Sequence, residues 1–201
     1  MVIGIDLRAL QTGHKYRGIG VVAKRVTNYI LEMGHRDGHE FVFFEYDEPE
    51  DPTDLITIPE GLAFSVQKLG RMPEREDVGK LKKINRAVRE LYGTPIKPAR
   101  KVDVFLQYDY VFGVPKNTRT VVVKHDLIPY LFWSKYFESA WVPFKNKALR
   151  TTIRTLFANH KYMQLLRRGL KNAGVIVSVS NSTKQDLQKY FKTNPNKIKV
   201  A

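Results

Sequence analysis

Short runs of apolar residues recur along this chain, and many of their members are β-branched or aromatic. Runs of this length and composition predict strands that are buried on both faces of a parallel sheet. They lie at residues 2–7, 40–46, 62–69, 102–108, 119–126 and 174–180, and "NKIKVA" (196–201) begins one further strand.

Between these runs the apolar residues recur at helical spacing, which predicts amphipathic helices. Gly34 ends the first helix as a C′ residue, and the apolar stripe of this helix consists of Val22, Val26, Tyr29, Ile30 and Met33. Gly93 and Pro95 close a second helix, whose stripe consists of Leu81, Ile84, Val88 and Leu91.

The C-terminal third continues the same alternation. Residues 134–172 favour one or two helices, and Ser182 is the expected N-cap of a last helix, with Gln185 at the capping-box position. Strands that alternate with helices predict an α/β fold with a Rossmann-like, doubly wound, mostly parallel sheet and helices on both faces. We expect residues 1–201 to form a single domain of this class.

The composition is that of an ordinary globular protein, with 43% hydrophobic and 27% charged residues. The absence of cysteine excludes disulfides and thiolate metal sites, and it fits a reducing compartment. The N-terminus lacks the pattern of a signal peptide, and no 18 consecutive residues are apolar. We therefore expect a cytoplasmic protein. Because the sequence stops inside a predicted strand, we also expect a truncated fragment or one half of a larger molecule.

The formal net charge is +14, and it is unevenly distributed. Residues 40–60 are acidic, whereas residues 139–172 hold eight Lys or Arg and neither Asp nor Glu. A basic amphipathic segment of this kind can lie on an anionic membrane or bind another anion. The alternative explanation is a core-packing helix with a solvated basic face, and the apolar side of the segment favours it. The candidate contacts are Lys145, Lys147, Arg150, Arg154, Arg167 and Arg168.

Candidate chemistry gathers where predicted strands end, because ligands of such sheets bind beyond the carboxyl ends of the strands. Four segments meet this criterion: Asp6–Arg8 with the Gly18–Gly20 loop, Gln107–Tyr110, His125–Asp126 and Ser178–Ser182. They contain no Walker loop, no nucleophile elbow and no His or carboxylate spacing typical of a metal site.

The stretch "GIGVVA", which begins at Gly18, formally matches the dinucleotide fingerprint, with Glu45 or Asp47 near the end of the next strand. The fingerprint requires its first glycine directly after the strand, but eleven residues separate Asp6 from Gly18. A nicotinamide-dependent oxidoreductase is therefore disfavoured. The glycines and Arg17 still form a helix start that suits an anion, although a loop that merely enters a helix explains them as well.

His125 and Asp126 lie where a strand gives way to a proline-containing turn. His125 can exchange a hydrogen bond with a substrate, and Asp126 can fix its tautomer or bind a hydroxyl. The alternative is a turn in which Asp126 caps the following backbone. Asp109 is equally ambiguous, and the flanking Tyr108 offers a platform for a sugar or another ring.

Three of these segments, in order, resemble the N-terminal half of family-4 retaining glycosyltransferases, which consist of two Rossmann-like domains (the GT-B architecture). "IGIDLRAL…YRGIGVVAKRVTNYIL" is similar to their first strand, glycine loop and first helix. "VVVKHDLIPYLF" is similar to their His-Asp-Leu-x-Pro segment, and "AGVIVSVSNSTKQDLQKYF…NKIKV" to the stretch that leads to the interdomain linker. The resemblance covers nearly the whole chain, although residues 40–100 contribute little.

The resemblance implies a transferase that moves a sugar from a nucleotide-sugar donor to an acceptor with retention, without a metal or a further cofactor. The C-terminal domain, which chiefly binds the donor in this family, is absent here. Gly18 and Gly20, with Arg17 beside them, then lie near the donor diphosphate. Where the family often has Arg-Tyr after the second glycine, this chain has Val21-Val22, so the contacts of that pair are missing.

The same resemblance implies that His125, with Asp126, lies near the transferred sugar and the acceptor hydroxyl. The acceptor, a sugar or a lipid-linked molecule, would then contact the N-terminal half through Asp6, Arg8, Tyr108, Asp109 and Ser180. Nucleic acid is the less favoured partner, and a peripheral position at the inner face of a membrane is compatible with the basic segment. A non-catalytic basic domain that binds anionic membrane or nucleic acid remains the main alternative.

Overall fold

The computed structural model describes residues 1–13, 15–72, 96–108, 114–115, 117–131, 160, 163–164 and 166–201. Several sequence predictions therefore lie outside the described residues. They are the second amphipathic helix, most of the helical segment 134–172, Asp109, and the basic residues Lys145, Lys147, Arg150 and Arg154.

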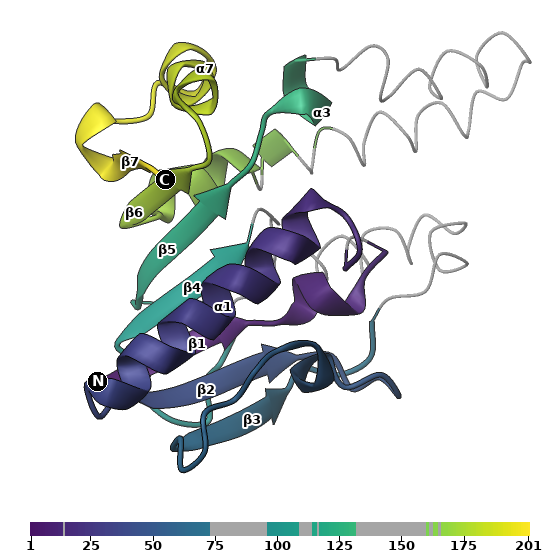
Figure 1. Cartoon of the computed structure of the whole chain (residues 1–201). Helices are drawn as coiled ribbons and strands as arrows, with labels where there is room; N and C mark the ends of the chain where they lie inside the picture. Colours follow the sequence, from purple (N-terminus) through teal and green to yellow (C-terminus); the bar gives the residue numbers. More distant parts are fainter. Residues whose placement is uncertain are drawn as a thin grey trace, which may run out of the picture.

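The described residues form one sheet of seven strands, all of them parallel, in the order β3-β2-β1-β4-β5-β6-β7 (Figure 1). The predicted α/β class with a Rossmann-like sheet is thereby confirmed. Each apolar run of the sequence contributes a strand. Their bounds are Val2–Asp6, Glu40–Glu45, Phe64–Lys68, Val104–Tyr108, Arg119–Lys124, Val175–Ser178 and Ile198–Val200 for β1 to β7.

The strand order reverses between β1 and β4, which makes this pair the topological switch point of the sheet. Ile3 pairs with Val104 and Ile5 with Leu106 in register. On the other side of β1, the chain continues to β2 and β3. In open sheets of this kind, ligands bind outside the carboxyl ends of the strands at the switch point. The sequence segments after β1 and β4 therefore border the expected ligand position.

The helices complete the connections. Among the described residues the longer helices are α1 (Gly18–Arg36) and α7 (Asn181–Phe191), and α3 is described over Ile128–Leu131. Residues 166–172 are also helical, and they are called the 166–172 helix below. The described residues also contain the 3₁₀ turns η1 (Arg8–Gln11), η2 (Pro52–Leu55) and η5 (Pro195–Lys197). Among the helices in the described ranges, none is both long enough and apolar enough to cross a membrane.

The prediction that Gly34 ends the first helix is wrong. Helix α1 continues to Arg36, with Asp37 as its C-cap, and the left-handed conformation expected of a C′ glycine belongs to Gly38 (φ 67°). Gly34 has a different reason to be glycine. A Cβ atom there would lie 2.5 Å from Cζ of Phe41, so the missing side chain lets α1 pack closely on β2.

The predicted start of the last helix is wrong by two residues. Ser180, rather than Ser182, is the N-cap of α7, and its hydroxyl oxygen accepts a hydrogen bond from the Thr183 N–H at 3.1 Å. Ser182 lies within the first turn. The helix ends at Lys192, whose left-handed conformation (φ 53°) is uncommon for a residue with a side chain.

Two of the apolar clusters explain how helices cover the sheet. One joins α1 residues such as Leu31 to Ile5 and Val123, and the other joins Leu170 and Leu187 to Val122. Since successive strand residues face opposite sides of a sheet, the two clusters lie on opposite faces of β5. Helical cover of both faces across the whole sheet stays a prediction.

Candidate functional site

Asp6 and Arg8 form an ion pair at the carboxyl end of β1. The Arg8 Nε and Nη2 atoms donate to the two carboxylate oxygens at 2.8 and 2.7 Å, and the Arg8 backbone N–H donates at 3.1 Å. Gln107 of β4 adds its Nε2 at 3.4 Å, so the pair bridges the switch point. Asp6 is 1% and Arg8 3% exposed. The two side chains therefore hold each other, and their predicted contact with an acceptor stays a prediction.

The surroundings of Arg8 keep its guanidinium charged. Burial opposes the charge, but the Asp6 carboxylate and the Tyr46 phenol outweigh it and raise the pKa of Arg8 above its ordinary value. Its Cζ atom also lies 5.7 Å from the centroid of the Tyr46 ring. A fixed positive charge, paired with an equally buried carboxylate, thus lies behind the edge where ligands of such sheets bind.

Gln11 is a structural contact that the sequence analysis did not single out. Its amide oxygen accepts from the Tyr46 backbone N–H at 2.7 Å, while its Nε2 donates to the carbonyls of Tyr46 at 3.0 Å and Glu50 at 3.3 Å. The η1 turn is thereby fastened to the chain that leaves β2. A polar residue that ends the otherwise apolar run after Asp6 was the signal available in the sequence.

Glu45, at the end of β2, is also buried, and it forms an ion pair with Lys68 of β3. Its second carboxylate oxygen accepts no hydrogen bond from the described part of the chain. Burial raises the pKa of Glu45, and Lys68 only partly offsets this. Because this carboxylate is buried and paired with Lys68, and eleven residues separate Asp6 from Gly18, the structure gives the dinucleotide-binding alternative no support.

The start of α1 lies toward the carboxyl ends of β4 and β5 (Figure 1). No described side chain caps it, and its first turn contains no acidic residue. Nothing lies within 4 Å of a Cβ atom built on Gly18, and the φ of Gly18 is not positive. Arg17 and Tyr16 beside it are exposed, Tyr16 to 78%. The fold therefore leaves open space and unpaired helix N–H groups at this position.

Tyr108 ends β4 in a closed environment. It is 1% exposed, and its hydroxyl lies 2.7 Å from the hydroxyl oxygen of Thr27 in α1. Burial raises the pKa of the phenol, which keeps Tyr108 neutral at ordinary pH. This arrangement connects the sheet to α1. The sequence analysis suggested that the Tyr108 ring forms a platform for an acceptor. The ring is buried in this structure, so this role stays a prediction.

His125 and Asp126 follow β5 directly, as predicted. One Asp126 carboxylate oxygen accepts a hydrogen bond from the Ile128 backbone N–H at 2.9 Å, which is the turn-capping arrangement. The carbonyl of His125 accepts from the Thr183 hydroxyl at 2.8 Å, so the start of α7 positions this segment. A role of His125 and Asp126 in catalysis stays a prediction.

The remaining candidate residues in the described ranges are Ser180, Arg167 and Arg168. The Ser180 hydroxyl acts as the N-cap of α7 and lies 3.1 Å from the Thr183 hydroxyl, and its predicted contact with an acceptor stays a prediction. Arg167 and Arg168 are exposed on the 166–172 helix. Within the described ranges, no group of three or more His, Cys, Asp or Glu side chains could hold a metal ion.

No protein-family model matches the chain, and a search of curated proteins finds no match. The class is therefore defined by the fold, which is a Rossmann-like α/β sheet with its switch point at β1 and β4.

Proposed function

We propose that this chain is the acceptor-side half of a retaining glycosyltransferase that uses a nucleotide-sugar donor. The observation that carries the proposal is the uncapped start of α1, where Gly18 has neither a steric nor a conformational need to be glycine. A glycine that the fold does not require leaves space for a ligand to approach the backbone closely.

The ligand that this position favours is an anion. The first-turn N–H groups and the positive end of the helix dipole both favour negative charge. Arg17 adds an exposed cation at the same place. In the proposed enzyme this anion is the diphosphate of the donor. The resemblance of the β1–α1, β5–α3 and β6–α7 segments to the glycosyltransferase pattern supplies the identity of the donor.

The proposed chemistry breaks the bond between the anomeric carbon and the donor diphosphate and forms a bond to the acceptor oxygen on the same face of the sugar. Negative charge grows on the leaving diphosphate, and fixed donors such as N–H groups stabilise it without reorganising. His125 hydrogen-bonds the transferred sugar or the acceptor hydroxyl. Asp126 and Thr183 hold the His125 segment in place.

Release of nucleoside diphosphate from a panel of nucleotide sugars tests the proposal. The assay compares the 201-residue chain with the longest natural polypeptide that contains it. We expect turnover by the longer polypeptide and none by the isolated 201-residue chain. Turnover by the isolated chain contradicts its assignment as half of an enzyme. If neither polypeptide turns over any donor of the panel, the assignment as a glycosyltransferase is wrong.

A matched pair of histidine variants tests the site. In the longer polypeptide, His125→Ala should lower turnover by several-fold to roughly a thousandfold, as expected when one hydrogen-bonding group near the reacting centre is lost. His35→Ala, an exposed position in the last turn of α1, is the control and should leave turnover unchanged. Equal turnover of both variants, or a large loss of melting temperature in His125→Ala alone, favours a purely structural turn.

A further inference from the structure

Two adjoining cavities lie between the 166–172 helix and α7, and Arg167 and Tyr190 line both. One has a volume of about 560 Å³ and the other about 630 Å³, each within the usual range for small-molecule sites. We call the pair the α7 groove. Its described lining contains none of the residues proposed to contact the donor or the acceptor, although Tyr130 and Leu131 closely follow the His125–Asp126 turn.

The smaller cavity is basic. Its lining includes four cationic side chains, and none of its described lining residues is acidic. Lys197 is held in place, because its Nζ donates to the carbonyls of Lys171 at 3.2 Å and Ala173 at 3.0 Å. Arg167 and Lys171 lie one helical turn apart, where like charges repel and destabilise a helix. Four cationic side chains thus line one cavity, and no described acidic side chain lines it with them.

Lys192 provides independent evidence that this charge has a use. It is the C-cap of α7 in the left-handed conformation, a position at which glycine is the usual residue. A side chain there costs conformational energy that glycine avoids. The lysine is nevertheless present, exposed, and part of the cavity lining.

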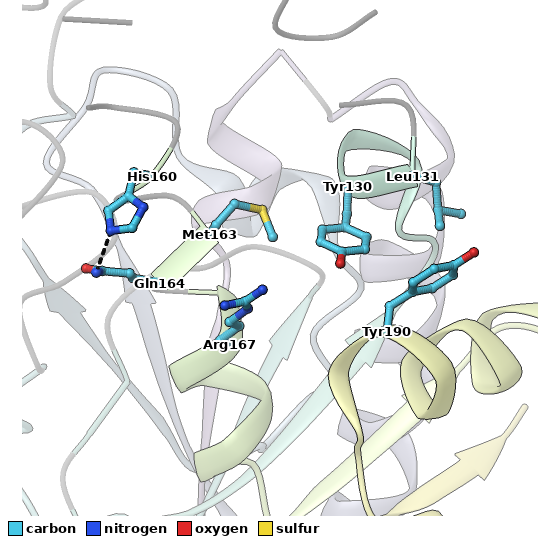
Figure 2. A pocket seen from close by; sticks show the side chains of 7 residues that line it. All are labelled: Tyr130, Leu131, His160, Met163, Gln164, Arg167 and Tyr190. Atoms are coloured by element: carbon cyan, nitrogen blue, oxygen red, sulfur yellow. Dashed lines mark hydrogen bonds between the residues drawn. The ribbon is translucent and has the colours of Figure 1, made fainter. Parts of the chain in front are cut away.

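The larger cavity is aromatic and apolar on one side (Figure 2). Tyr130 and Leu131 of α3 and Tyr190 of α7 lie opposite Met163 and Arg167. The Tyr130 ring lies 5.5 Å from the Tyr190 ring and 4.9 Å from that of Phe191, centroid to centroid. Such a surface suits a ring or a short apolar group. Its remaining polar members are His160 and Gln164, whose side chains lie 2.8 Å apart.

We propose that the α7 groove binds a small phosphorylated molecule, with its phosphate among Arg167, Lys171 and Lys192 and its ring against Tyr190 and Tyr130. Arg167 lines both cavities, so its guanidinium can contact the phosphate where the phosphate joins the rest of the ligand. The chemical class is a phosphate monoester of a cyclic compound.

This site is separate from the one proposed at the start of α1. The 166–172 helix and α7 pack on the face of β5 that contains Val122, whereas α1 packs on the face that contains Val123. A phosphate in the α7 groove therefore lies on the other side of the sheet from Gly18. The proposal holds or fails independently of sugar transfer.

Calorimetric titration of the 201-residue chain with phenyl phosphate, inorganic phosphate and phenol tests the proposal. Phenyl phosphate should bind several-fold to about tenfold more tightly than inorganic phosphate, because its ring adds an aromatic contact. Phenol should bind more weakly than either. Equal affinity for phenyl phosphate and inorganic phosphate overturns the part of the proposal that concerns the aromatic cavity.

Two variants with the same change in charge locate the phosphate. Arg167→Ala should weaken phenyl phosphate binding by about tenfold to a hundredfold, the loss expected for a charge-assisted hydrogen bond. Lys199→Ala removes an exposed charge of β7 outside the groove lining and should change the affinity less than twofold, because salt screens distant charges. Equal losses in the two variants mean that only the general positive charge attracts phosphate, which overturns the site.

Lys192→Gly separates binding from stability. Glycine relieves the left-handed backbone, so the melting temperature should rise while phenyl phosphate affinity falls at least several-fold. An unchanged affinity contradicts the placement of the phosphate. If phenyl phosphate does not bind, but phosphatidylserine vesicles or RNA bind the wild type and Arg167→Ala weakens that binding, the groove serves a macromolecular surface and the proposal is wrong.

Discussion

Replacing Arg8 by methionine tests whether the Asp6–Arg8 pair supports the sheet at its switch point. Methionine places an unbranched apolar side chain beside Tyr46, where the arginine stem lay. The substitution removes the two hydrogen bonds, at 2.8 and 2.7 Å, that the guanidinium donates to the Asp6 carboxylate. The Asp6 carboxylate, which is only 1% exposed, then keeps two hydrogen bonds. One comes from the backbone N–H of residue 8, and the other, at 3.4 Å, comes from the side-chain amide of Gln107. Removing one partner of a buried ion pair costs about 3–5 kcal/mol.

The melting temperature gives the magnitude directly. In a domain of this size, 1 kcal/mol corresponds to roughly 2–4 °C, so Arg8→Met should lower the melting temperature by about 6–20 °C. Urea unfolding followed by circular dichroism measures the same loss as a free energy. Arg36→Met is the control. Arg36 is an exposed partner of Glu32, and exposed pairs contribute at most about 1 kcal/mol.

The double variant Asp6→Asn/Arg8→Met separates pairing from packing. If the pair matters because each charge neutralises the other, the double variant should be markedly more stable than Arg8→Met, since no uncompensated charge stays buried. Losses that simply add, or an Arg8→Met loss below about 1 kcal/mol, refute the reasoning. Either result means that the Asp6 carboxylate reaches solvent or another donor once the guanidinium is gone.

Three further predictions concern single positions. Gly34→Ala should cost about 1–3 kcal/mol in urea unfolding, because its Cβ collides with Phe41; an unchanged midpoint means that the helix shifts freely. The pKa of Glu45 is raised in the folded state, so the free energy of unfolding of the wild type should fall as pH rises above the ordinary carboxyl pKa. Glu45→Gln lacks this titration, so any deficit in its free energy of unfolding relative to the wild type should shrink as pH rises. Parallel stability curves of the two proteins from pH 4 to 8 contradict this. Gly18→Ala should stabilise the chain by about 0.4–1 kcal/mol, yet lower donor turnover in the longer polypeptide. Unchanged turnover means that the donor diphosphate does not bind at the start of α1.

The strands were the predictable part of this fold, and the reason is physical. Inner strands of a parallel sheet are buried on both faces, so β2 and β5 appear in the sequence as short apolar runs, Phe41–Phe44 and Val121–Val123, between polar residues. Helix ends were harder to predict. Gly34 and Gly38 both suit a helix terminus, and only the close contact with Phe41 shows which of them serves packing. Likewise, serine is a favoured N-cap residue at both position 180 and position 182, and residue preference alone does not show which of the two caps α7.

The ends of the strands were predictable, whereas the contacts of the candidate residues were not. The candidate residues follow β1, β4, β5 and β6 as expected, and that a ligand binds there stays a prediction. The sequence could not show that Arg8 folds back onto Asp6 instead of facing a ligand, since that depends on the η1 turn and on Gln107, a hundred and one residues from Asp6. For Asp126 the sequence left two alternatives open, and the structure contains the turn-capping contact, in which the carboxylate accepts from the Ile128 N–H.

The position of β1 inside the sheet, between β2 and β4, affects how the chain folds during synthesis. β1 is made first, yet Ile3 pairs with Val104, a partner that the ribosome adds about 5–20 s later at ordinary rates of about 5–20 residues per second. Until then, β1 can pair with β2 on one side only, and its other edge stays open to foreign strands. Slow, long-range closure of this kind limits folding rate more than final stability. Yield during expression should therefore depend on chaperones and temperature more than on the stability of the finished sheet.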